Sequence, residues 1–244
     1  MRTSVNFVKY EKVSEGTFYR MKGKVVNIVG LTIESLGPEA KMGDICLIYP
    51  DSKESGKPAM AEVVGFKDRK TLLMPYEPIE GIGFGSIVEN TGLPLTIQVS
   101  DNLLGQTLDG LGRPTGDSVT VNGKVYSVEA PPPDPLSRDI IEDVLPLGVK
   151  AVDGLITIGK GQRIGIFAGS GVGKSTLLGM FARNTKADVN VIALIGERGR
   201  EVREFIERDL GPEGMKRSVV VVATSDKPAL ERNKAAKTAT AIAE

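Results

Sequence analysis

The sequence predicts an α/β protein whose core is a doubly wound parallel sheet, preceded by a small antiparallel β-barrel. Between about residues 19 and 90, short β-prone runs alternate with Gly, Pro, Asp and Ser, and no helical period is present. From about residue 144, strand-like and helix-like runs alternate, which is typical of a parallel sheet with crossover helices. Within this second part, a strand-like run, a glycine-rich loop and a helix-forming run follow one another over residues 164–183.

The composition narrows the class of protein. Its 31 basic and 31 acidic residues balance, so the chain lacks the electrostatic signature of a nucleic-acid binder. Histidine is absent and Cys46 is the single cysteine, which excludes Ser-His and Cys-His catalysis, an intrachain disulfide and a multi-thiolate zinc site. The sequence contains no apolar run of 18 residues and no signal-peptide pattern. We therefore expect a soluble cytoplasmic protein that can attach peripherally to a membrane complex.

The first half divides into three expected regions: an N-terminal arm at residues 1–19, a β-barrel at residues 20–91 and a connector at residues 92–143. The runs that we expect as barrel strands are residues 23–29, 31–35, 44–49, 59–66, 71–74 and 86–89. The glycine-rich run GIGFG at residues 81–85 has no helix-forming run after it, so we interpret it as a tight barrel turn.

Two signals stand out in the connector. Asn122-Gly123, between residues 119–121 and 124–126, predicts a two-residue β-hairpin. The cluster PPPDP at residues 131–135 predicts a stiff, extended spacer, with a ligand for a proline-reading module as the alternative.

Residues 144–244 are the expected nucleotide-binding domain. After the glycine-rich loop and its helix, we expect a strand at 189–195, an amphipathic helix at 201–210, a buried strand at 218–223 and a helix from Pro228 to Glu244. The ligand of such a sheet lies at the carboxyl ends of its strands.

The glycine-rich loop has the chemistry of a phosphate-binding site. It follows residues 164–167, expected as a buried strand, and fits the pattern G-x-x-x-x-G-K-[ST] with Ala168 at the first position. Its glycines let backbone N–H groups turn toward an anion, and the positive end of the following helix points to the same place. We expect Lys174 to neutralise phosphate charge and the Ser175 hydroxyl to complete a Mg²⁺ shell. The residues predicted to bind the nucleotide are Gly169, Ser170, Gly171, Val172, Gly173, Lys174, Ser175 and Thr176.

Glu197 and Arg198 follow the next strand of the expected sheet. With right-handed crossovers, the end of that strand lies on the same edge as the phosphate loop. A carboxylate there can polarise the water that attacks a terminal phosphate, and a guanidinium can hold the carboxylate or the phosphate oxygens. We expect Glu197 to be the general base or water-orienting residue, Arg198 its partner, and both to be catalytic together with Lys174.

These motifs closely resemble the type III secretion ATPases, and within them the flagellar protein-export ATPases. The residues that carry the resemblance are residues 148–155, 159–163, 167–176 and 196–202 and the proline cluster at 131–133. The family is related to the catalytic subunits of rotary ATP synthases. By position, its phosphate-loop lysine falls on Lys174, its Mg²⁺-binding hydroxyl on Ser175 and its catalytic carboxylate on Glu197.

The resemblance implies an N-terminal β-barrel, a RecA-like P-loop ATPase core, ATP with Mg²⁺, and a hexameric ring. It also implies a function: ATP hydrolysis that unloads and unfolds chaperone-bound substrates at the export gate, on the cytoplasmic side of the inner membrane. The implied partners are further copies of the chain, export-gate and stalk or regulator proteins, and chaperone–substrate complexes, without nucleic acid.

The end of the sequence departs from that family, which continues with a second apolar strand ending in the Mg²⁺-linked Asp (the Walker B strand), an arginine finger and a helical C-terminal domain. The last helix is also unusually polar, with Asn233 and Lys237 at positions that are usually apolar in the family. We expect a truncated chain with an incomplete core, which alone binds nucleotide weakly and hydrolyses it negligibly, because an arginine finger contributes about 10³–10⁵ in rate.

Four alternatives stay open. The first is a virulence-type secretion ATPase, which shares these motifs. The second is the catalytic subunit of a rotary ATP synthase, although the usual sequence after Gly-Glu-Arg there is Thr-Arg-Glu rather than GRE at residues 199–201. The third is an RNA-translocating ring, which needs a basic, aromatic single-strand site. The fourth is a non-catalytic nucleotide-binding subunit.

Overall fold

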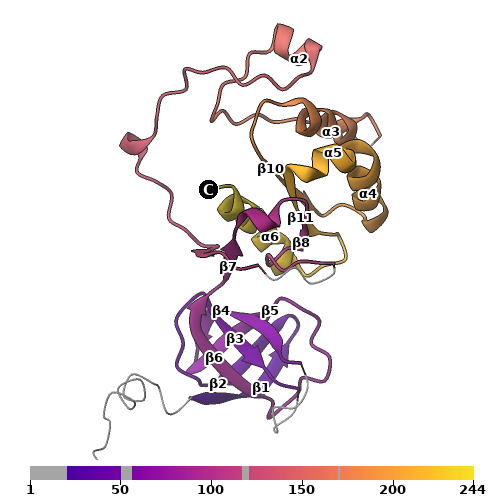
Figure 1. Ribbon diagram of the computed structural model, residues 1–244. Coiled ribbons are helices and arrows are strands. Elements are labelled where there is room, and N and C mark those ends of the chain that lie inside the picture. Colours follow the sequence, from indigo (N-terminus) through magenta and orange to yellow (C-terminus); the bar gives the residue numbers. More distant parts are fainter. Residues whose placement is uncertain (1–20, 51–56, 117–120, 170) are drawn as a thin grey trace, which may run out of the picture. The chain divides into compact units, whose positions relative to one another are not determined.

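The structure is a computed structural model of the chain, and it describes residues 21–50, 57–116, 121–169 and 171–244 (Figure 1). The chain divides into two compact units, one ending at Leu93 and one spanning Pro94–Glu244. Each is described by itself. The predicted N-terminal arm at residues 1–19 lies outside the described residues, and the predicted domain boundaries stay predictions.

The first unit is a closed antiparallel barrel with the strand order β1-β2-β5-β4-β3-β6 (Figure 1). Its strands are β1 (Lys22–Val29), β2 (Thr32–Leu36), β3 (Asp44–Ile48), β4 (Ala59–Lys67), β5 (Lys70–Pro75) and β6 (Ile87–Pro94). Each of the six predicted runs forms one of these strands. Along β4 and β5, buried residues alternate with partly exposed ones, as a sheet with one face on a core requires.

The barrel core is apolar. It consists of Val25, Ile33, Cys46, Ile48, Ala61, Val63, Leu73 and Val88. Burial raises the pKa of the Cys46 thiol to about 12, so this cysteine stays protonated and packs as a small hydrophobic side chain. The glycine-rich run at residues 81–85 lies in the loop between β5 and β6, as expected of a barrel turn.

The second unit contains a parallel sheet in the order β10-β11-β8. Its strands are β10 (Asn190–Ile195), β11 (Ser218–Ala223) and β8 (Thr107–Asp109). Both pairings are parallel, with Ile192 opposite Val220 and Leu108 opposite Val221. The predicted fold class, a parallel-sheet core after a small β-barrel, is therefore confirmed. Strand β8 comes from the segment that we predicted as a connector.

Helices cover both faces of this sheet (Figure 1). They are α3 (Lys174–Asn184), α4 (Gly199–Glu204), the π-helix η3 (Phe205–Leu210), α5 (Gly211–Lys216) and α6 (Ala229–Ala243), with the short helices η1 (Asp101–Leu103), η2 (Pro135–Ser137) and α2 (Lys150–Leu155) before them. Strand β11 shows why two layers form: Val219 and Val221 pack with α6, while Val220 packs with α3, α4 and η3. The predicted helix at 201–210 is thus interrupted, because its second half takes the wider π-helical form.

One sequence prediction for this unit needs correction. Residues 164–167 do not form the expected buried strand: they have no strand partner, and Phe167 is 97% exposed. A strand needs a neighbour for its backbone N–H and C=O groups, and none of the described strands pairs with residues 164–167.

The hairpin at Asn122-Gly123 stays a prediction. The second arm, β9 (Lys124–Ser127), pairs antiparallel with β7 (Thr96–Val99). Part of the expected first arm, residues 117–120, lies outside the described residues. A turn signal predicts a reversal of the chain, but it does not fix which strand is the partner.

Candidate functional site

The phosphate loop ends where α3 begins. Gly171 and Gly173 have φ angles of +75° and +92°, in the left-handed region that favours glycine. Gly173 is the N-cap of α3, and its carbonyl accepts the hydrogen bond from the N–H of Leu177 at 2.9 Å. No atom lies within 4 Å of the Cβ position at Gly169, Gly171 or Gly173, so an anion can approach this backbone closely. The predicted loop and helix are both present.

Glu197 lies just past the carboxyl end of β10. The N–H of Gly196 donates to the carbonyl of Ala223 at 2.8 Å, and the N–H of Ser225 donates to the carbonyl of Glu197 at 3.0 Å. Hydrogen bonds to residues at the end of β11 therefore hold the backbone around Glu197 in place. Gly196, with φ +74°, turns the chain sharply between the strand and this residue.

Lys174 and Glu197 meet in this structure. The Nζ of Lys174 lies 3.7 Å from Oε1 of Glu197, and the two side chains are 50% and 33% exposed. Both line a cavity of about 360 Å³ between the loop, α3, β10 and α4. The other lining residues are Ile164, Ile166, Ser175, Leu178, Phe181, Ala193, Leu194, Glu201, Val202 and Phe205. Sequence reasoning thus placed a lysine, a hydroxyl and a carboxylate in one cavity.

Arg198 differs from its prediction. Its Nη1 lies 3.3 Å from Oε1 of Glu201, and the ion pair recorded for Glu197 in the described part of the chain is with Lys174. Arg198 is the N-cap of α4 with extended backbone, so its side chain runs along the first turn of that helix toward the residue three positions on. Glu201 lines the cavity and was missed. Its position four residues after Glu197, in the first turn of a helix, was the available signal.

The structure describes all but one of the remaining predicted nucleotide-binding residues. Ser175 lines the cavity, Val172 and Thr176 are exposed on the loop and on the first turn of α3, and Ser170 lies outside the described residues. The residues present fit a Mg²⁺–nucleotide: open glycines, a lysine, a hydroxyl and a carboxylate converge on one helix N-terminus. The described residues contain no cluster of three acidic or cysteine side chains that would bind a metal alone.

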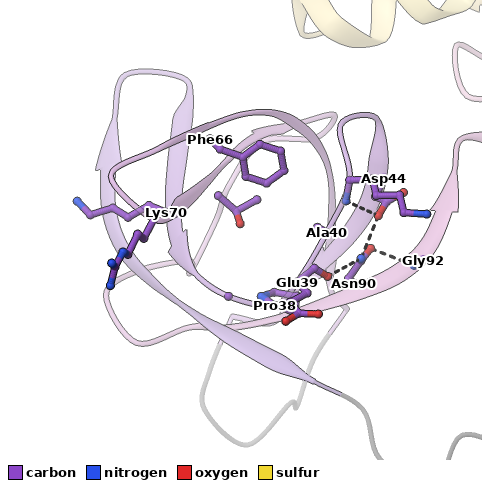
Figure 2. A pocket seen from close by; sticks show the side chains of 12 residues that line it. Pro38, Glu39, Ala40, Asp44, Phe66, Lys70, Asn90 and Gly92 are labelled. Carbon is purple, nitrogen blue, oxygen red and sulfur yellow. Dashed lines mark hydrogen bonds between the residues drawn. The ribbon is translucent and has the colours of Figure 1, made fainter.

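A larger hollow, of about 760 Å³, lies in the barrel unit. Figure 2 shows its hydrogen bonds: the Asp44 carboxylate accepts from the N–H of Lys41 and from Nδ2 of Asn90, and Oδ1 of Asn90 accepts from the N–H of Gly92. Lys70, at its margin, pairs with Glu34 at 2.7 Å. These polar groups hold the barrel loops together, so we interpret this hollow as structural.

The helix N-terminus, the glycine loop and the acidic residue after the neighbouring strand define a P-loop nucleotide-binding protein. Two protein-family profiles match the chain and identify its family. The nucleotide-binding domain of the ATP synthase alpha/beta family matches residues 148–244, and the β-barrel domain of the same family matches residues 25–92. Together they cover more than half of the chain, which belongs to the ATP synthase alpha/beta family.

Comparison with individual relatives shows which members of the family the chain is similar to. A flagellum-specific ATP synthase of Bacillus subtilis (strain 168) is 58% identical over 227 residues, which are 93% of this chain and 52% of that protein. A type 3 secretion system ATPase of Xanthomonas euvesicatoria is 50% identical over 226 residues, which are 92% of this chain and 51% of that protein. The chain therefore spans about half the length of the curated relatives it matches.

A solved structure agrees with these relatives. It is the assembled ATPase EscN in complex with its central stalk EscO, from the type III secretion system of enteropathogenic E. coli. It superposes with a TM-score of 0.80 at 46% identity, over 91% of this chain and 53% of that one. The resemblance to type III secretion ATPases, inferred from the motifs, is confirmed. Within the described ranges, no helix is both long and apolar enough to cross a bilayer.

Proposed function

We propose that this chain binds Mg²⁺–ATP at the loop before α3, and that it belongs to an ATPase that drives protein export through a flagellar type III secretion apparatus. The observation that carries the proposal is the pairing of Lys174 with Glu197 beside an open glycine loop. A lysine alone at such a loop supports binding, whereas a carboxylate within reach of the same phosphates supports hydrolysis.

Each residue has a distinct role in this proposal. The N–H groups of the loop and the first turn of α3 surround the phosphates, and Lys174 neutralises their charge. The Ser175 hydroxyl would help to hold a Mg²⁺ ion, which would neutralise charge on the phosphate oxygens. The Glu197 carboxylate orients the attacking water and accepts its proton. Arg198 directly follows Glu197 and pairs with Glu201 at the start of α4; we assign it the role of steadying phosphate oxygens after its side chain leaves Glu201.

The export function rests on the relatives. Among those compared here, the flagellum-specific protein of B. subtilis has a higher identity than the type 3 secretion protein of X. euvesicatoria, which favours the flagellar branch over the virulence branch. The EscN structure is an assembled ATPase with a central stalk, so we propose a ring of copies, a stalk partner and a place at the cytoplasmic face of the export apparatus. Unloading of chaperone-bound substrates is the work we assign to hydrolysis.

The first experiment measures Mg²⁺–ATP binding by titration calorimetry for the wild-type chain and for Lys174→Ala. Because a hydrogen bond between charged groups contributes about 1.5–3 kcal/mol, the variant should bind at least about tenfold more weakly. Lys216→Ala is the matched control, since Lys216 pairs with Glu213 on α5 and does not line the cavity. Equal affinities of wild type and Lys174→Ala would refute the proposed site.

The second experiment tests the export function. Immobilised protein is exposed to purified flagellar chaperone–substrate complexes, and retention that depends on Mg²⁺–nucleotide supports export. ATP turnover that rises with added single-stranded RNA, without retention of those complexes, would instead favour the RNA-translocating alternative.

A further inference from the structure

We infer that Glu197 occupies Lys174 before the nucleotide binds: it competes with phosphate for Nζ, so a ligand that uses this lysine must displace the carboxylate and binds more weakly for it. This inference rests on the proposed function and deepens it. Its basis is the contact of 3.7 Å between Nζ of Lys174 and Oε1 of Glu197, inside the cavity that the phosphate loop borders.

Both partners are placed by backbone contacts that are independent of their ion pair. Lys174 is the first residue of α3, and the hydrogen bond from Leu177 to Gly173 fixes the turn before it. Glu197 is held at the end of β10 by the bonds of Gly196 and Ser225 described above. The neighbouring cation, Arg198, is engaged by Glu201 at 3.3 Å. The fold therefore presents Glu197 to Lys174 before any ligand arrives.

A phosphate changes this arrangement by exchange of one anion for another. The lysine of such a loop contacts the β- and γ-phosphates, so a diphosphate or triphosphate reaches Lys174 whereas a monophosphate does not. When a phosphate oxygen takes the place of the carboxylate at Nζ, Glu197 is released beside the terminal phosphate. The residue that orients the attacking water is then released from Lys174 when a diphosphate or triphosphate binds.

The size of the effect follows from exposure. Lys174 and Glu197 are both partly in contact with water, and ion pairs of this kind change an equilibrium by about 1.5- to 5-fold. Removal of the competing carboxylate should therefore tighten binding of ADP by that factor. Binding of AMP should not change, because its phosphate does not require Lys174.

The experiment compares the dissociation constants of ADP, a non-hydrolysable ATP analogue and AMP for the wild-type chain and for Glu197→Gln. The expected result is binding of ADP and the analogue that is about 1.5- to 5-fold tighter, with AMP unchanged. Glu204→Gln is the matched control: it removes the same charge from α4, but Glu204 pairs with Arg208 and does not line the cavity. Unchanged ADP binding in Glu197→Gln, or an equal gain for AMP, would overturn the inference.

A second variant and a double-mutant cycle distinguish loss of the ion pair from misfolding of a variant. Glu197→Asp keeps the charge but shortens the side chain by one methylene, and should also tighten ADP binding. Without ligand, Lys174→Gln and Glu197→Gln together should destabilise the chain by less than the sum of the single substitutions, since each removes the same pair. Additive effects would contradict the ion pair. If Lys174→Ala binds ATP normally, the proposed function fails. If only Glu197→Gln behaves as wild type, the inference alone fails.

Discussion

Glu231 of α6 is a carboxylate buried without full hydrogen bonding, and its replacement by Gln should stabilise the second unit at neutral pH. The side chain is 2% exposed, and Oε1 has no hydrogen-bond partner among the described residues. It packs against the turn after β8, where a Cβ at Gly110 would lie 2.9 Å from Cγ of Glu231. The nearest recorded cation is Lys227, with its Nζ 3.8 Å from Oε1 and its side chain 45% exposed.

The expected gain follows from two opposing contributions. An unsatisfied buried polar group costs about 1–3 kcal/mol, and more when it is charged. The ion pair with the partly exposed Lys227 offsets at most about 1 kcal/mol of this cost. Gln keeps a buried polar group at this position and removes only the extra cost of the charge, so the variant should be more stable than wild type by at most about 1–2 kcal/mol at pH 7. For a unit of this size, that gain raises the melting temperature by about 2–8 °C.

The same carboxylate gives the stability a pH dependence of known sign. Burial raises the pKa of Glu231, and Asp109 acts in the same direction, while Lys227, Arg113 and the backbone of Gly110 oppose it. The folded state thus binds the proton more tightly than the unfolded state. Stability is fully present below the ordinary pKa of 4.5 and is lost as pH rises through the higher folded value. The advantage of Gln over wild type should shrink toward pH 4.

Urea unfolding followed by circular dichroism at pH 4, 5.5 and 7 measures both effects, with the transition of the second unit analysed separately from that of the barrel. Glu213→Gln is the control, because Glu213 is an exposed carboxylate on α5 and its removal should change the free energy of unfolding by no more than about 0.5 kcal/mol. A wild type that is more stable than Glu231→Gln at pH 7, or a difference that grows as pH falls, would show that the carboxylate is well compensated in the folded state.

Two further predictions concern one contact in each unit. Glu129 accepts hydrogen bonds from Lys234 and Lys237 of α6, both at 2.6 Å, which hold the pKa of this carboxyl below its usual range. Glu129→Gln should lower the free energy of unfolding by about 1–2 kcal/mol at pH 7. The loss should begin to fade below about pH 4.5, where this carboxylate takes up a proton in the unfolded chain, and should be gone once pH falls through the lower pKa of the folded state. In the barrel, a Cβ at Gly23 would lie 1.9 Å from a backbone carbonyl oxygen of the turn after β2. Gly23→Ala should therefore destabilise the barrel by about 1–3 kcal/mol, measured by urea unfolding, whereas Gly83→Ala, with open space around it, should not.

A specific result would contradict each of these two predictions. Equal stabilities of wild type and Glu129→Gln at pH 7 would mean that the two lysines find other partners at no cost. A barrel that tolerates Gly23→Ala as well as Gly83→Ala would mean that the turn after β2 moves freely.

The sequence predicted the barrel well because its strands are set by local signals. In β2 and β5, for example, buried side chains alternate with more exposed ones, and turn residues such as those around Gly30 and Gly43, both at positive φ, separate the strands. The parallel sheet was harder, since its pairings join residues far apart in the chain. Strand β8 illustrates the difficulty: three residues, Thr107–Asp109, are too few for a period, and only the pairing with β11 makes them a strand.

The site was predicted to the extent that it depends on motif chemistry. Lys174, Ser175 and Glu197 were identified because a loop, a helix start and a strand end each have a residue type with one evident use. The partner of Arg198 was not, because two acidic residues, Glu197 and Glu201, are within reach of a flexible guanidinium. Sequence spacing does not decide between them. The extended N-cap conformation of Arg198 does.

The strand before the phosphate loop was expected to position the site, yet the site forms without it. Ile166 packs against a separate cluster of Leu147, Ile158 and Phe181, outside the parallel sheet. What brings Lys174 to Glu197 is the packing of α3 on β10, through the cluster that contains Ala182 and Ile192.

Hydrogen bonds at the far end of α3 support this packing. Nδ2 of Asn190 donates to the carbonyl of Ala182, and Nη2 of Arg217 donates to the carbonyls of Ala182 and Thr185. These bonds occupy the last carbonyls of α3 and tie them to the amino ends of β10 and β11. Because α3 is a rigid rod, fixing its last turn at one edge of the sheet and packing its side on β10 determines where its first residue lies. The position of the first residue of α3 relative to Glu197 is therefore set by the packing on β10 together with contacts at the end of the helix opposite the phosphate loop.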